Sequence, residues 1–255
     1  MIPNDQTAPV LPAAEASDRS SAPAAPGKSE PDLFLLGRQA AGLARRQHDG
    51  RGVFTRSRQL LATSAWKGPR DAAESYVEEA DLPGLGGLEA DRSAGARTLV
   101  ASTATGAREA AAAGMRVIYR LPYRAGEPES ARIARLSALQ ALGAEGVVID
   151  GVLPSPEGEP MGLDTLQIYA SCRLGLSVPH LLADFDRLGH RLAQMALGFG
   201  ADELFGPILP ERALRLGNNA HNPVLTRKEA AILLRGAGLA PCERLTGGVL
   251  EEIPA

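Results

Sequence analysis

The stretch GHRLAQMALGFGADELFG, residues 189–206, carries most of the information about the fold. Its small and aliphatic residues predict a helix over 188–199, and Gly200 is placed to end that helix. ADELFG (201–206) follows as a short strand or an acidic turn, and PHLLADF (179–185) precedes the helix as a predicted strand. A strand, a helix and a second strand in direct succession form the unit from which parallel sheets are built.

The same alternation continues on both sides of this stretch. Further strands are predicted at 53–61, 98–102, 115–121 and 146–150, and helices within 31–51, 71–79, 106–114, 129–142 and 163–174. Thr226 and Glu229 form a capping-box pattern at the start of a last helix. Alternating strands and helices indicate right-handed βαβ units. We expect an α/β fold, namely a partial or compacted (β/α) barrel of about six parallel strands with flanking helices, with an open doubly wound sheet as the alternative.

Composition limits the class of protein. The 255 residues, 44% of them hydrophobic, suffice for one sizeable core, which we place at 31–255. Residues 1–30 are rich in Pro, Ala and Ser and predict a disordered extension without a signal-peptide pattern. A net charge of −3 with scattered Lys and Arg argues against nucleic-acid binding, and no apolar run approaches the roughly 18 residues of a membrane span. Two cysteines without paired spacing predict a reducing, cytoplasmic location.

Three blocks of the chain resemble radical S-adenosylmethionine (SAM) enzymes that make menaquinone and deazaflavins: aminofutalosine synthase, dehypoxanthinyl futalosine synthase and FO synthase. The blocks are LFLLGRQAAGLARRQHDGRGVFTRSRQLLATSAW (33–66), the segment from AGMRVIYRL to GEPMG (113–162), and the segment from PHLLADF to PCERLT (179–246). The third block, with GADELFG and LTRKEAAILLRGAG, is the most specific, and the family's C-terminal region would cover about 179–255. The resemblance implies a (β/α) barrel.

The resemblance also implies an iron–sulfur site whose ligands this chain lacks. Members of the family hold a [4Fe–4S] cluster with three closely spaced cysteines. Aligning the first block without gaps places the degenerate cluster positions on Trp66, Arg70 and Ala73, none of which can ligate iron. Cys172 and Cys242 fall in later elements. We therefore expect no iron–sulfur cluster and no bound cofactor. Without the cluster, the resemblance gives little reason to expect SAM binding. Trp66 would fill the vacated cavity.

Candidate ligand-binding residues follow from the barrel itself, because function usually lies at the carboxyl ends of its strands. The polar residues predicted there are Arg120, Tyr123, Arg124, Asp150, Asp184, Asp202 and Glu203. Arginines facing carboxylates predict a small polar pocket for a carboxylate or phosphate. The alternative is that these are ordinary loop charges that complete strand ends and helix N-termini. No catalytic residue is assigned.

Two more specific interpretations are weaker. Asp202 and Glu203 could act as a general acid and base, although such a pair more often caps a turn. His180 and His190, with Asp184 and Asp186, raise the option of a metal site, but their spacing is not that of a zinc site, and no metal is predicted. GLGGLEAD (84–91) lacks the strand and helix of a nucleotide fingerprint and is interpreted as a loop.

Three functions fit these observations. The favoured one is a catalytically degenerate radical-SAM-like protein, a pseudoenzyme that binds a metabolite or assists a true radical SAM synthase in the futalosine pathway to menaquinone. Its partners would be that synthase or a second copy covering exposed sheet edges, together with a small-molecule ligand. The second is an enzyme with cluster-independent chemistry at Asp150, Asp202 or Arg120. The third is a decayed protein without activity.

Overall fold

The computed structural model describes residues 32–60, 66–67, 72–82, 88, 95–159, 162–209 and 224–254, which belong to the unit that begins at Asp32. Its helices are α1 (Leu33–Gln47), η1 (Glu79–Asp81, a 3₁₀ turn), α3 (Ala104–Ala112), α4 (Glu129–Ala144), α5 (Gly162–Gly175), α6 (Phe185–Leu197) and α7 (Arg227–Gly236). Its strands are β1 (Arg51–Thr55), β2 (Ser57–Leu60), β3 (Trp66–Lys67), β4 (Glu74–Glu78), β5 (Thr98–Ala101), β6 (Arg116–Tyr123), β7 (Gly151–Pro156), β8 (His180–Asp184), β9 (Glu203–Phe205), β10 (Ile208–Leu209), β11 (Leu225–Thr226), β12 (Ala240–Arg244) and β13 (Leu250–Glu252).

One large sheet has the order β13-β12-β1-β9-β8-β7-β6-β5-β4-β2-β3. All pairings from β12 to β2 are parallel, and the strands β13 and β3 add antiparallel at the two ends. Among the described residues, this large sheet thus contains nine strands in parallel pairings, more than the six expected. The difference arises because 53–61 divides into β1 and β2, because β4 was assigned to a helix, and because β12 joins the same sheet.

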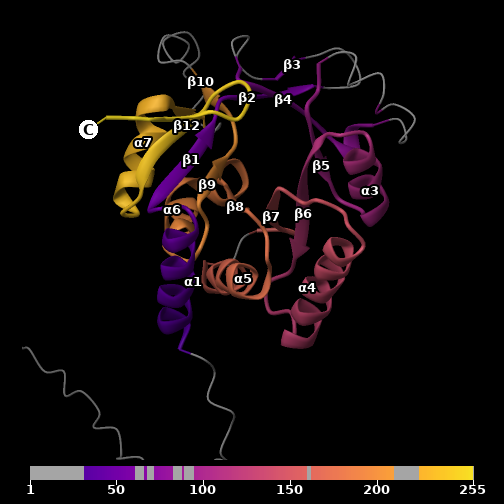
Figure 1. Cartoon of the computed structure of the whole chain (residues 1–255). Coiled ribbons are helices and arrows are strands. Elements are labelled where there is room, and N and C mark those ends of the chain that lie inside the picture. The colour runs from indigo at the N-terminus through magenta and orange to yellow at the C-terminus, as the bar shows by residue number, and fades with distance from the viewer. Residues whose placement is uncertain are drawn as a thin grey trace, which may run out of the picture. The chain divides into compact units, whose positions relative to one another are not determined.

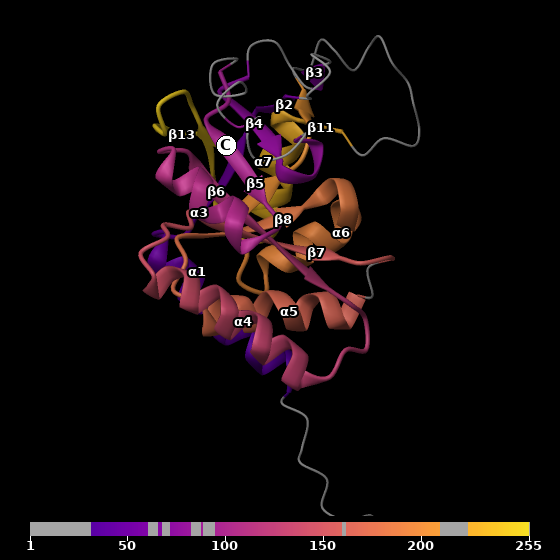
Figure 2. The same cartoon turned by 90° about the vertical axis from the view of Figure 1, so that its right-hand side faces the viewer.

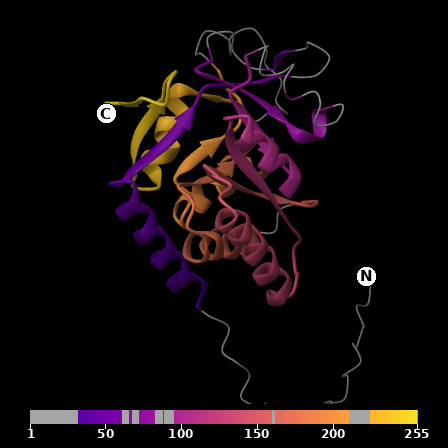
Figure 3. The same cartoon turned by 45° about the vertical axis from the view of Figure 1, so that its right-hand side comes forward.

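The sheet curls so far that one short stretch of the chain pairs with both ends of the run from β9 to β4. β1 pairs with β9 and β2 pairs with β4, yet only Arg56 separates β1 from β2. One bent stretch of backbone, residues 51–60, therefore joins both ends of the run from β9 to β4, and Figures 1 and 3 show the strands curving about a common axis. From β4 to β9 the strand order follows the chain, without the switch point of a doubly wound sheet. The expected compacted (β/α) barrel is confirmed.

The helices cover the outside of the curled sheet (Figures 1 and 2). Their starts follow the local capping chemistry: Asp32, Thr103 and Asp184 accept backbone N–H bonds at the first turns of α1, α3 and α6. The predicted capping box of Thr226 and Glu229 is present at α7. No described helix combines the length and apolar character needed to cross a bilayer.

Two element predictions were wrong. The expected helix at 71–79 is strand β4, because Tyr76 and Val77 pack on opposite faces of the sheet. The expected strand GVVID lies too early, since β7 begins at Gly151 and Asp150 precedes it. Some predictions concern residues that the structure does not describe, namely 1–31, Arg70 and GLGGLEAD (84–91) except Leu88. The prediction for the side chain of Trp66 is among them.

Alternation along the strands divides the barrel interior into three layers, which β6 shows clearly. Arg116 contacts carboxylates near the N-terminal ends of the strands, a layer we call the base. Ile118 belongs to an apolar layer, the plug, formed by Val100, Ile118, Leu153, Leu182 and Phe205. Arg120 contacts Glu78, Ser155 and Asp184 near the C-terminal ends, a layer we call the mouth.

Candidate functional site

Four strands contribute one polar side chain each to the mouth. Arg120 of β6 donates from Nη2 to Glu78 Oε1 of β4 at 2.9 Å and from Nη1 to Ser155 Oγ of β7 at 3.1 Å. The same Nη1 lies 3.8 Å from Oδ2 of Asp184 at the end of β8. Arg120 thus connects strands β4, β7 and β8 at the end of the barrel where the βα loops of such folds usually carry function.

Asp184 is the carboxyl of the mouth whose pKa is shifted by burial. It is 3% exposed, and burial raises the pKa of its carboxyl to about 6, because the distant Arg120 and an N–H bond from Arg187 at 3.3 Å only partly offset the desolvation. A carboxyl of this kind changes its charge near neutral pH and can either donate or accept a hydrogen bond. Burial also raises the pKa of the Tyr76 hydroxyl, whose ring packs against the plug beneath.

Two predicted residues at the end of β6 do not face the mouth. Tyr123 points outward into the core under α5, where its hydroxyl lies 2.7 Å from Thr165 Oγ1, and it is 1% exposed. Arg124 is exposed and pairs with Glu157 on the surface. Alternation explains the difference, because Arg120 and Tyr123 are three positions apart in β6 and therefore lie on opposite faces of the strand.

Asp150, Asp202 and Glu203 lie at the base rather than at the carboxyl ends of strands. Asp150 precedes β7 and accepts the Val117 N–H at 3.0 Å, while Asp202 precedes β9 and Glu203 opens it. Asp150 was predicted at the carboxyl end of a strand, and this placement was wrong because the apolar run GVVID precedes strand β7 and does not form it. The predictions for Asp202 and Glu203 were wrong because β9 starts, rather than ends, at this acidic pair.

Glu203 is the centre of the charge network at the base. Its Oε2 accepts from Arg244 at 2.5 Å and lies 3.4 Å from Nη2 of Arg116, which also pairs with Glu74 at 3.1 Å. Burial alone would raise the pKa of Glu203, but Arg116 and Arg244 outweigh it and lower the pKa to about 2. The carboxylate therefore stays charged and joins strands β6, β9 and β12.

Asp202 forms a second group beside this network. Its Oδ1 accepts from the fully buried guanidinium of Arg173 and from the Leu181 N–H at 2.8 Å. Its Oδ2 faces two imidazoles, His180 Nδ1 at 2.6 Å and His48 Nε2 at 3.5 Å. Sequence reasoning missed His48, Arg173 and Arg244. A barrel brings the starts of its strands together, so polar residues just before predicted strands were the available signal.

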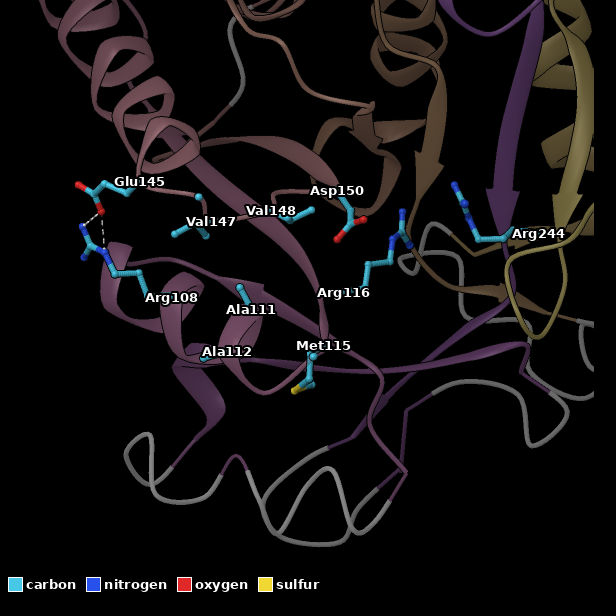
Figure 4. A pocket seen from close by; sticks show the side chains of 12 residues that line it. Arg108, Ala111, Ala112, Met115, Arg116, Glu145, Val147, Val148, Asp150 and Arg244 are labelled. Carbon is cyan, nitrogen blue, oxygen red and sulfur yellow. Dashed lines mark hydrogen bonds and ion pairs between the residues drawn. The ribbon is translucent and has the colours of Figure 1, made fainter.

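A cavity lies at the base, and Figure 4 shows its lining. It has a volume of about 830 Å³ and opens between the start of β6, the end of α3 and the segment before β7. Arg108 and Glu145 pair across one side at 2.7 Å, and Arg116 lies between Asp150 and Arg244 (Figure 4). Much of the wall is small residues of α3 and backbone, and its arginines are already paired, Arg108 with Glu145 and both Arg116 and Arg244 with Glu203. The mouth therefore remains the better candidate site.

The residues present do not fit a cysteine-ligated [4Fe–4S] cluster. The aligned positions surround β3 and the start of β4, where Trp66 and Ala73 offer no thiol. Cys172 lies in α5 and Cys242 in β12, and both are buried. Burial raises the pKa of the Cys172 thiol to about 12, which disfavours the thiolate that iron requires.

Comparisons with known proteins agree with the sequence resemblance. No family model matches the chain. It is 29% identical over 157 residues to a 5-amino-6-(D-ribitylamino)uracil–L-tyrosine 4-hydroxyphenyl transferase of Methanosarcina acetivorans, covering 54% of this chain and 42% of that protein. It is 33% identical over 84 residues to the aminodeoxyfutalosine synthase of Thermus thermophilus, covering 32% of this chain and 23% of that protein.

The fold comparison points the same way. The crystal structure of methylornithine synthase matches with a TM-score of 0.60 at 14% identity, covering 82% of this chain and 89% of that one. At this identity the match establishes the barrel fold alone. In length, the chain matches less than half of each of the two curated relatives above. Over part of its length the chain is therefore similar to radical SAM enzymes of cofactor and menaquinone biosynthesis, and it has the barrel fold without cysteines at the aligned cluster positions.

Proposed function

We propose that this chain is a cluster-free, catalytically degenerate relative of these enzymes, which binds a small polar metabolite at the mouth and serves menaquinone or related cofactor biosynthesis as a binding or accessory protein. One observation carries the proposal: the buried Asp184 lies beside Arg120 at the carboxyl end of the barrel, while no thiol is found at the aligned cluster positions. Perturbed carboxyls with a charged neighbour are typical of functional sites.

The chemistry of the mouth favours a ligand that offers both donors and acceptors. Arg120 and Ser155 can donate to a carbonyl, carboxylate or phosphate oxygen, and Asp184 and Glu78 can accept from N–H or O–H groups. A ribityl-substituted pyrimidine or an amino acid has this combination of groups, and the relative from Methanosarcina acetivorans is named for acting on both. We therefore propose 5-amino-6-(D-ribitylamino)uracil, L-tyrosine and aminodeoxyfutalosine as the first ligands to test.

Binding at the mouth is tested by thermal shift and calorimetry on the full chain. A ligand at a hundred times its Kd stabilises the folded state by about 2.7 kcal/mol, enough for a clear rise in Tm. Arg120→Gln should abolish the rise, whereas Arg124→Gln, which changes an exposed arginine outside the mouth, should leave it intact. Absence of any rise with all three compounds, or equal losses in both variants, would contradict the binding site.

Loss of the radical chemistry is tested separately. The chain is incubated anaerobically with iron, sulfide and reductant, and then with SAM. We expect a colourless protein and no 5′-deoxyadenosine. A [4Fe–4S] absorption band, or reductive cleavage of SAM, would overturn the degenerate assignment even if the mouth binds a ligand.

A protein partner would be accommodated at the edge of the sheet. Among the described residues, β13 pairs with β12 alone and its three residues, Leu250–Glu252, are exposed, so its outer edge offers backbone groups for another strand. We propose that a full-length synthase or a second copy of this chain adds a strand there. Size-exclusion chromatography with light scattering measures self-association. Glu252→Pro should weaken whichever association is observed, because the N–H of Ile253 faces β12 and that of Glu252 therefore faces the outer edge. A monomer that fails to bind such a synthase would refute this part.

A further inference from the structure

We propose that His48, His180 and Asp202 bind one divalent transition-metal ion at the base of the barrel, with zinc as the first ion to test. The three residues come from separate elements: His48 follows α1, His180 opens β8 and Asp202 precedes β9. One ligand atom of each lies within 4.8 Å of the other two. This site is at the opposite end of the strands from the mouth, so it does not depend on the proposed function.

The distances need only small adjustments to hold a metal. Asp202 Oδ2 lies 2.6 Å from His180 Nδ1 and 3.5 Å from His48 Nε2. Ligand atoms of a tetrahedral zinc ion, with bonds of about 2.1 Å, are separated by roughly 3.4 Å. The two imidazoles are already stacked with their ring centres 5.1 Å apart, which holds both rings beside the carboxylate. Two imidazoles and one carboxylate suit zinc and its neighbours in the first transition row.

The two oxygens of Asp202 have different partners, and this division favours a metal at one of them. Oδ1 is satisfied by Arg173 and the Leu181 N–H, which fix the plane of the carboxylate. Oδ2 is left to the imidazoles. Carboxylate ligands of metal ions are commonly oriented in this way by hydrogen bonds to the oxygen that does not bind the ion.

The side chain of His48 gives a second indication of a metal ion, separate from the distances within the cluster. Its Nε2 is buried and has no hydrogen-bond partner among the described residues, although it faces the carboxylate oxygen of Asp202. A cation between the imidazole nitrogen and the carboxylate would satisfy both atoms.

An ion can reach this position from solvent. A cavity of about 550 Å³ is lined by Gln47, His48, Arg173, Val178 and Pro179 among others. His48 is the ligand on its wall, so water from the cavity can complete the coordination of the ion. The nearby guanidinium of Arg173 pairs with the same Asp202 and also donates to Gln47 Oε1 and the Gly200 carbonyl. Its charge weakens the site without occupying it.

The experiment uses the full, tag-free chain after removal of metal by chelation. Zinc binding is measured by equilibrium dialysis, and cobalt is used as a spectroscopic probe of coordination by nitrogen and oxygen. We expect one zinc per chain, a rise in Tm with zinc but not with magnesium, and cobalt bands of a low-symmetry site. His48→Gln and His180→Gln should each lower the affinity at least tenfold.

His190→Gln is the matched control. His190 is also a partly buried histidine with an unpartnered Nε2, but its ring packs on Phe185 outside the cluster. It should bind zinc as the unmodified chain does. His48→Asn serves as a second variant if His48→Gln does not fold, and circular dichroism of each metal-free variant confirms its folding. Absence of stoichiometric zinc, or unchanged affinity in both the His48 and His180 variants, would overturn the site.

Discussion

Replacing Asp184 by asparagine should stabilise this protein at neutral pH. The carboxyl is buried at the mouth, and its pKa rises from 3.8 to about 6 because desolvation outweighs the attraction of Arg120. A rise of this size corresponds to about 3 kcal/mol of unfavourable free energy for the ionised form in the folded state. Asparagine keeps an oxygen that can accept the Arg187 N–H at the start of α6 and cannot ionise.

The pH dependence follows from the direction of the shift. Between pH 4 and 6 the folded carboxyl holds its proton while the unfolded one has lost it, so the folded state binds more protons. The contribution of Asp184 to the free energy of unfolding therefore falls as the pH rises through this window, and it stays low above pH 6. Asp184→Asn removes that fall.

Urea unfolding at pH 4 and pH 7.5 measures the effect. The variant should match the unmodified protein at pH 4 and exceed it by about 3 kcal/mol at pH 7.5, which corresponds to about 1 M in the midpoint. Asp186→Asn, an exposed neighbour on α6, is the control and should change stability little. If Asp184→Asn is no more stable than the unmodified protein at pH 7.5, the burial cost assigned to this carboxyl is wrong.

Three further predictions concern the frame around the site, each read by urea unfolding. Glu203→Gln leaves Arg244 without its buried charged partner and should lower stability by roughly 3–5 kcal/mol; the wild-type contribution, full above about pH 4.5, should disappear as the pH falls towards 2. An unchanged midpoint at pH 7 would refute this. Gly52→Ala places a Cβ 2.6 Å from Leu234 Cδ2 of α7 and should lower stability by about 1–3 kcal/mol; an unchanged midpoint would contradict this. Thr226→Ala removes the capping box of α7 and should cost about 1 kcal/mol, whereas Thr226→Ser should retain most of it.

The helices were predictable because their signals are local. Apolar spacing and end residues placed α1, α4, α5 and α7 to within a few residues, and Gly114 at φ +70° ends α3 as expected. Strand β7 was misplaced because it contains Pro154 and Pro156, which argue against a central strand. The structure resolves the conflict: the ladder of β7 with β8 covers only Gly151 and Val152, so neither proline has to donate a hydrogen bond to β8. That pairing is non-local and has no trace in the local sequence.

The site was harder to predict than the fold for the same reason. A shift of a few residues in β7 moves Asp150 from one end of the barrel to the other, and the start of β9 does the same for Asp202 and Glu203. Arg120 and Asp184 were placed correctly at the mouth because β6 and β8 were located correctly. Their role in binding a ligand stays a prediction.

The plug separates the polar residues of the mouth from those of the base. Val100, Ile118, Leu153, Leu182 and Phe205 fill the barrel between the two polar layers, and four of them are at most 2% exposed. Apolar packing of this kind separates the charges of the mouth from those of the base, because it leaves no polar path between them. The base keeps its carboxylates paired with arginines and holds the strands together. The mouth keeps a buried carboxyl at a cost in stability, which is expected where a protein retains a binding site rather than only a fold.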